Sequence, residues 1–159
     1  MSSELKVDTI SEKTSANGVA IDSVTLKDGE VQNATITGGT LKDYVETDVA
    51  LSSAATLAID LANGNTGSVT LGHNVTDIDF TNVPTDGTSS FTLKITQDGT
   101  GSRTMAINAI TVNGGGNVTG LTPGNAGITL STAAASVDIV TFLFFDAGTP
   151  LLNALQNFS

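Results

Sequence analysis

The sequence predicts an all-β protein, in which an extended N-terminal arm (residues 1–46) precedes a β-sandwich of jelly-roll or immunoglobulin-like type (residues 47–159). Short runs of alternating apolar and polar residues are typical of strands with one buried face. The 17 glycines, together with Asn, Asp and Ser, fall between these runs and supply the turns. The third observation is the hydrophobic content of 39%, which is enough for one core, although apolar residues are sparse in the arm.

The arm has too few apolar residues to bury them within a single chain. Those it has recur every five positions, at Ile21, Leu26, Val31, Ile36 and Leu41. A spacing of five matches neither the helical nor the heptad period, and in one continuous strand it would place successive residues on opposite faces. We therefore expect the chain to turn between them, at Asn17-Gly18, Asp28-Gly29 and Gly38-Gly39. We interpret the arm as a segment in which identical chains wind together and share these trimer or anchor contacts; the alternative is a polar arm with accidental spacing.

The second unit contains candidate strands separated by glycine-rich turns. They are Thr56–Leu61, Ser68–Leu71, Val75–Phe80, Ser90–Thr96, Arg103–Ile107, Ile110–Val112, Gly127–Leu130, Val137–Phe145 and Leu151–Phe158. The most apolar is Val137–Phe145, in which both faces carry apolar side chains. This predicts that one face lies in the core and the other against a neighbouring subunit.

The stretch Ile95–Ile107 predicts two strands joined by a tight turn. Asp98-Gly99 and Gly101 provide the backbone freedom for the reversal, and we expect Gly99 or Gly101 to have a positive φ. Arg103 is expected to have a structural role as one member of an ion pair with Asp98 or Asp138.

Two stretches resemble known proteins. The first, Val7–Gly29, contains TISEKT at Thr9–Thr14, NGV at Asn17–Val19 and KDG at Lys27–Gly29. It resembles a segment that recurs in virion structural proteins of tailed bacteriophages, near tail-fibre or capsid-appendage modules.

The second stretch lies in the β-unit and carries the turn QDGTGSRT at Gln97–Thr104, the pair Val137-Asp138 and the closing Gln156–Ser159. It resembles a small β-domain found at the C-termini of phage fibre and virion proteins. The loop Asn113–Gly127 departs from that family because it is richer in glycine and lacks an aromatic residue. The resemblance implies a structural module of a virion.

Composition argues against several functional classes. A net charge of −10 with six Lys and Arg residues argues against nucleic-acid binding. No apolar stretch of about 18 residues is present, so no membrane span is expected. The polar start indicates no signal peptide. Without cysteine, the chain can form neither a disulfide nor a thiolate metal site.

Candidate catalytic residues are few, and we predict no catalytic, cofactor or metal site. His73 is the only histidine and is interpreted as a surface residue. Asp77 and Asp79 alternate on a strand, with Phe80 pointing away. A carboxylate pair could bind calcium or act on a glycan, but a solvated strand face is the favoured interpretation.

The sequence therefore predicts a non-enzymatic virion structural protein, made in the bacterial host cytoplasm and located on the virion surface. We expect a homotrimeric capsid decoration (cement) protein or head fibre, with residues 1–46 bound to the major capsid protein or another virion protein. The alternatives are a short tail-fibre or tail-adaptor subunit that contacts a host glycan or another fibre, and a glycan depolymerase that uses Asp77 or Asp79.

Overall fold

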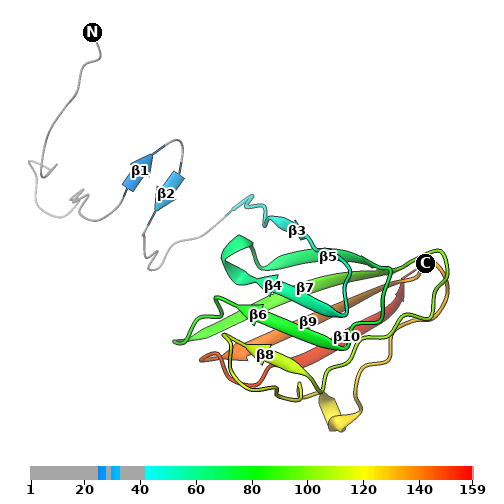
Figure 1. Ribbon diagram of the computed structural model, residues 1–159. Helices are drawn as coiled ribbons and strands as arrows, with labels where there is room; N and C mark the ends of the chain where they lie inside the picture. The colour runs from blue at the N-terminus through cyan, green and yellow to red at the C-terminus, as the bar shows by residue number, and fades with distance from the viewer. Residues whose placement is uncertain (1–24, 28–29, 33–41, 159) are drawn as a thin grey trace, which may run out of the picture. The chain divides into compact units, whose positions relative to one another are not determined.

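The computed structural model describes residues 25–27, 30–32 and 42–158, and the chain divides into two units, Met1–Tyr44 and Val45–Ser159 (Figure 1). In the first unit, β1 (Thr25–Lys27) and β2 (Glu30–Gln32) pair antiparallel, with Leu26 opposite Val31. This pairing agrees with the expected reversal of the chain between Leu26 and Val31. The other positions of the five-residue rhythm, Ile21, Ile36 and Leu41, lie outside the described residues.

The second unit consists of two β-sheets, which confirms the all-β prediction. The five-stranded sheet has the order β10-β9-β7-β5-β3, and the three-stranded sheet has the order β4-β6-β8. The strands are β3 (Asp48–Ala50), β4 (Thr56–Asp60), β5 (Thr66–Leu71), β6 (Asp77–Thr81), β7 (Thr88–Gln97), β8 (Ile110–Val112), β9 (Val137–Phe145) and β10 (Leu151–Phe158), with 3-10 turns η1 (Leu61–Asn63) and η2 (Pro123–Asn125). Figure 1 shows the smaller sheet in front of the larger one.

The connectivity differs from that of a jelly-roll or immunoglobulin-like sandwich. From β3 to β8 the chain alternates between the two sheets, so neighbouring strands within each sheet run parallel: β3 with β5, β5 with β7, β4 with β6 and β6 with β8. Among the strands β3 to β10, the antiparallel pairs are β7–β9 and β9–β10. The expected sandwich types are built from antiparallel strands. Turn residues between two apolar runs do not reveal whether the chain reverses within one sheet or crosses to the other.

The inner faces of the two sheets form the core. Phe80 of β6 lies at its centre, with ring centroids 5.0 Å from Phe142, 4.9 Å from Phe144 and 6.1 Å from Phe91. All four rings have no exposed surface. Phe80 therefore joins the three-stranded sheet to the five-stranded sheet through aromatic contacts.

Several strand predictions need correction. Predicted strand Arg103–Ile107 forms only a single parallel bridge, between Met105 and Val75, so the hairpin expected at Ile95–Ile107 is wrong. Predicted strand Gly127–Leu130 is not a strand. Each segment nevertheless buries one apolar side chain: Met105 is 5% exposed and Leu130 is 6% exposed. Neither segment forms a continuous ladder of backbone hydrogen bonds with a neighbouring strand. Strand β3 was not predicted, because three residues carry too little alternation.

Candidate functional site

Strand β9 presents apolar side chains on both of its faces, as the sequence predicts. Its inner positions, Asp138, Val140, Phe142 and Phe144, are buried. Its outer positions, Val137, Ile139, Thr141, Leu143 and Phe145, are half-buried or exposed. Since the inner positions already supply the core, packing among residues 42–158 does not account for the outer apolar residues.

Strand β10 extends this outer face. Leu151 pairs with Leu143, Leu155 with Ile139 and, after a register shift, Phe158 with Val137. The exposed fractions are 42% for Leu151, 58% for Leu155, 48% for Phe158 and 55% for Phe145. We call this surface the β9–β10 face, formed by Val137, Ile139, Leu143, Phe145, Leu151, Leu155 and Phe158.

The β9–β10 face carries no charged side chain, although the chain has a net charge of −10. The polar positions within it, Thr141 and Asn153, are uncharged partners across the two strands. The charged residue on the neighbouring strand β7 is Lys94, which is exposed and lies opposite Ile139. An exposed group of apolar side chains of this kind is a candidate interaction site.

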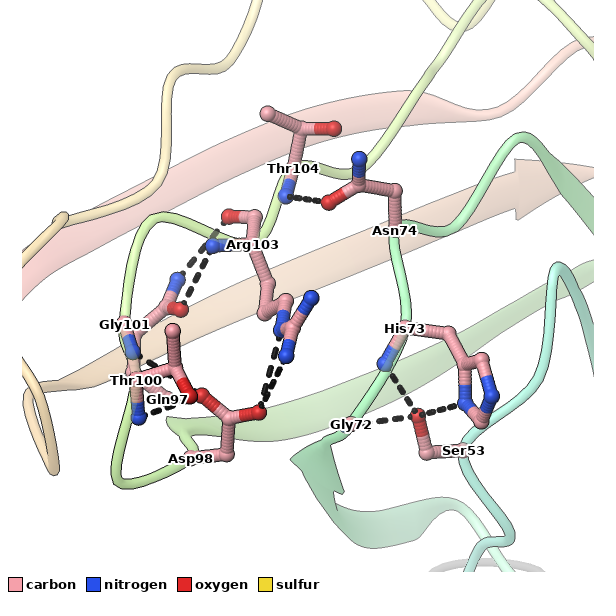
Figure 2. A network of polar contacts seen from close by, with 10 residues as sticks. All are labelled: Ser53, Gly72, His73, Asn74, Gln97, Asp98, Thr100, Gly101, Arg103 and Thr104. Atoms are coloured by element: carbon pink, nitrogen blue, oxygen red, sulfur yellow. Dashed lines mark hydrogen bonds and ion pairs between the residues drawn. The ribbon is translucent and has the colours of Figure 1, made fainter.

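The turn after β7 is a corner fixed by side-chain hydrogen bonds (Figure 2). The Gln97 side chain, 2% exposed, accepts from the Arg103 backbone N–H at 2.8 Å and donates to the Arg103 carbonyl at 2.9 Å. Asp98 Oδ1 accepts from the backbone N–H groups of Thr100 and Gly101, each at 2.9 Å. These bonds direct the chain out of β7 toward the other sheet instead of back along β7.

Arg103 forms the expected ion pair with Asp98, not with Asp138. Its Nη2 and Nε atoms donate to Asp98 Oδ2 at 2.7 and 3.0 Å. The Arg103 guanidinium, together with the Gly101 N–H, lowers the pKa of Asp98 below its ordinary value. Of the two glycines in the turn, Gly101 has a positive φ of 74°, whereas Gly99 does not, so the structural role belongs to Gly101.

Asp138, the other partner considered for Arg103, is a buried carboxylate whose hydrogen bonds come from other residues. It accepts hydrogen bonds from the Ser131 N–H at 2.7 Å, the Ser131 hydroxyl at 2.6 Å and the Asn157 N–H at 3.0 Å. These donors compensate for the loss of hydration. Asp138 thus ties the segment before β9 to the end of β10, and Arg103 is not needed as its partner.

The residues considered for catalysis do not converge on one site. The Ser53 hydroxyl accepts from the backbone N–H groups of Gly72 and His73, at 2.8 and 3.2 Å, and lies 3.5 Å from His73 Nδ1 (Figure 2). These bonds fix the connection between β5 and β6. Asp77 and Asp79 lie on the outer face of β6, and each has one buried oxygen without a hydrogen-bond partner. In the described part of the chain, no group of three or more His, Asp or Glu residues could hold a metal ion.

Comparison with known proteins identifies no relative of this chain. No protein-family model, curated protein or solved structure matches the chain. Within residues 25–27, 30–32 and 42–158, no helix has the length and apolar character to cross a membrane. The β9–β10 face is therefore the structural feature on which the proposed function rests.

Proposed function

We propose that the protein is a structural subunit of a tailed-phage virion that acts as a homotrimer on the surface of the particle. The observation that carries this proposal is the uncharged, apolar β9–β10 face on a chain of net charge −10. The resemblance of Val7–Gly29 and Gln97–Thr104 to phage virion proteins supplies the biological setting.

A second copy of the chain is the partner that best fits the β9–β10 face. Acidic copies repel one another wherever their carboxylates meet. On this face two copies could come together without burying an unpaired charge, which would be costly. Lys94 at its margin is one of only six Lys and Arg residues, and so offers the acidic surface of a neighbour a rare cation.

The β9–β10 face alone supplies only part of the free energy needed for a permanent trimer. Its four most exposed residues are already about half buried, and complete burial of such a side chain contributes roughly 1.5–3 kcal/mol. Their remaining exposed surface is thus worth on the order of 5 kcal/mol per copy. Association costs an estimated ~4–15 kcal/mol. We assign the remaining stabilisation to the arm, residues 1–46, which would also attach the trimer to the major capsid protein or another virion protein.

Sedimentation equilibrium of the full chain tests this proposal with a matched pair of variants. Leu155→Asp places a carboxylate on the β9–β10 face, and Thr70→Asp places the same group at an exposed outer position of β5. We expect a trimer for the parent and for Thr70→Asp, and at least tenfold weaker association for Leu155→Asp. A monomeric parent at micromolar concentration, or equal effects of the two variants, would contradict the proposal.

The position on the virion is a separate part of the proposal. We propose a capsid decoration, cement or head-fibre protein, with a tail-fibre subunit as the alternative. Cryo-electron microscopy of intact particles distinguishes these positions directly. Particles with the protein on the tail would replace the capsid assignment while leaving the assembly role intact.

A further inference from the structure

Strand β10 ends in a β-bulge. Leu155 pairs with Ile139 and Phe158 pairs with Val137, so an advance of three positions along β10 matches two positions along β9. The two intervening residues of β10 therefore face a single residue of β9. A bulge of this kind interrupts the alternation of a strand and redirects the side chains that follow it.

The bulge is fixed by Asn157 and by the buried carboxylate of Asp138. Asn157 has a positive φ of 63°, a conformation that glycine adopts freely and that asparagine tolerates better than most residues. Its backbone N–H donates to Asp138 Oδ1 at 3.0 Å, and the Ser131 hydroxyl donates to the same oxygen at 2.6 Å. The N–H that the bulge removes from regular pairing thus keeps an acceptor. Because Asp138 is 1% exposed and lies on the inner face, its carboxylate adds no charge to the β9–β10 face.

The bulge decides which face of the sheet Phe158 occupies. In a regular strand, side chains alternate between the two faces, so Phe158 would point to the face opposite that of Leu155. It would then lie across from Ser136, on the inner side of the sheet. With the extra residue, Phe158 instead lies across from Val137, on the outer side together with Leu155. There it is 48% exposed.

We propose that this bulge positions Phe158 on the β9–β10 face as an anchor for the second copy of the chain. This inference rests on the proposed trimer. Aromatic residues are enriched at protein interfaces, and about half of the Phe158 surface remains to be buried by a partner. Asn157 and Asp138 act as positioning residues, since their role is to hold the backbone of the bulge.

Phe158 also carries the apolar surface to the far end of β9. Phe145, the other exposed aromatic residue of the β9–β10 face, lies at the opposite end of this nine-residue strand. At about 3.4 Å per residue, the two positions are on the order of 27 Å apart. In the regular register, the polar residue Asn157 would lie across from Val137. The bulge therefore exchanges a polar side chain for an aromatic one at this end of the face.

Sedimentation equilibrium of the full chain tests the role of the bulge. Asn157→Val disfavours the positive φ, because a β-branched residue is poorly accommodated there, whereas Asn157→Gly permits it and is the matched control. We expect Asn157→Val and Phe158→Ala to weaken association about tenfold. Asn157→Gly should associate like the parent, and so should Gln156→Ala, which changes an exposed residue within the bulge that is not part of the β9–β10 face.

A pair of deletions tests the direction of Phe158 without relying on the φ of one residue. Removal of Asn157 alone eliminates the extra residue, and regular alternation then keeps Phe158 on the outer face. Removal of both Gln156 and Asn157 turns Phe158 to the inner face. We therefore expect the single deletion to associate like the parent and the double deletion to associate as weakly as Phe158→Ala.

A combined variant shows whether the bulge acts through Phe158. Asn157→Val together with Phe158→Ala should associate no more weakly than Phe158→Ala alone, since both changes remove the same ring from the contact. Additive losses would mean that the bulge affects association by another route, and would overturn the positioning role.

The same measurements separate this inference from the proposed assembly. Phe158→Ala leaves the backbone of the bulge in place, so parent-like association of this variant overturns the inference even if another variant does not fold. A trimeric parent with parent-like association of Asn157→Val likewise overturns the positioning role alone. A monomeric parent overturns the proposed assembly itself.

Discussion

The outer face of the five-stranded sheet has two halves with opposite chemistry. Over β3, β5 and β7 it presents mainly hydroxyl side chains: Thr66, Ser68, Thr70, Ser90, Thr92 and Thr96. Over β9 and β10 it presents the apolar residues of the β9–β10 face. In both halves the inner side chains are buried in the core. Hydroxyl side chains at the outer positions are therefore sufficient for a strand to form in this sheet. The apolar residues on β9 and β10 therefore exceed what folding requires, which is why we assign them to association.

The largest expected effect separates the two faces of β9. Phe142→Ala removes a fully buried ring that contacts Phe80, and we expect it to lower the free energy of unfolding by about 3–5 kcal/mol. Phe145→Ala, on the outer face and 55% exposed, should cost less than about 1 kcal/mol in a dissociated subunit. Urea unfolding at two protein concentrations measures both and separates folding from assembly. Equal losses at high dilution would mean that the outer face of β9 stabilises the single chain, and the contrast between the halves would fail.

A smaller effect is expected at the corner after β7, the strand that pairs parallel with β5 and antiparallel with β9. Gly101 has a φ of 74°, and a Cβ there would collide with the Thr132 carbonyl and lie 3.0 Å from the Ala134 nitrogen. We expect Gly101→Val to destabilise the protein by at least about 2 kcal/mol, since both the backbone conformation and the contact are unfavourable. Gly99→Val is the matched control. It meets no atom within 4 Å and should change stability by less than about 0.5 kcal/mol. Similar thermal melts for the two variants would show that the corner adapts, contrary to its hydrogen-bonded geometry.

The smallest effect concerns pH and the same corner. The Arg103 guanidinium lowers the pKa of Asp98 in the folded protein, so folding favours the ionised form. This contribution to stability is present above the unfolded pKa, about 3.9, and is lost as the pH falls through the lower folded pKa. We therefore expect the melting temperature of the parent to fall more steeply below pH 4 than that of Asp98→Asn. Parallel pH profiles of the two proteins would indicate that the ion pair makes no net contribution, as solvent-exposed pairs often do not.

The sequence predicted the antiparallel half better than the parallel half. Strands β9 and β10 have the predicted bounds, because long alternating runs carry a strong signal. The apolar outer positions of β9 were likewise visible in the alternation.

The crossing after β7 illustrates what local patterns cannot reveal. Asp98, Gly99 and Gly101 have the composition of a hairpin turn. The direction of the chain depends on Gln97, whose buried side chain binds the backbone of Arg103. A glutamine at the end of a strand carries no sequence signal for this role. Its partners are the backbone N–H and carbonyl groups of Arg103. Such backbone groups do not depend on the type of side chain, so they leave no pattern in the sequence.

The alternation of the chain between the two sheets has a consequence for folding kinetics. Each parallel neighbour of β5 or β6 is reached only after the chain has passed through the opposite sheet. Neither sheet can be completed while the other is absent, so both must assemble in one cooperative event. Pairings of this kind close long loops before any contact compensates for the lost entropy, and they place a domain among the slow folders, with times of about milliseconds to seconds. During synthesis, β9 and β10 emerge after β3–β8, so the apolar β9–β10 face is displayed only when the rest of the sandwich is available to receive their inner faces.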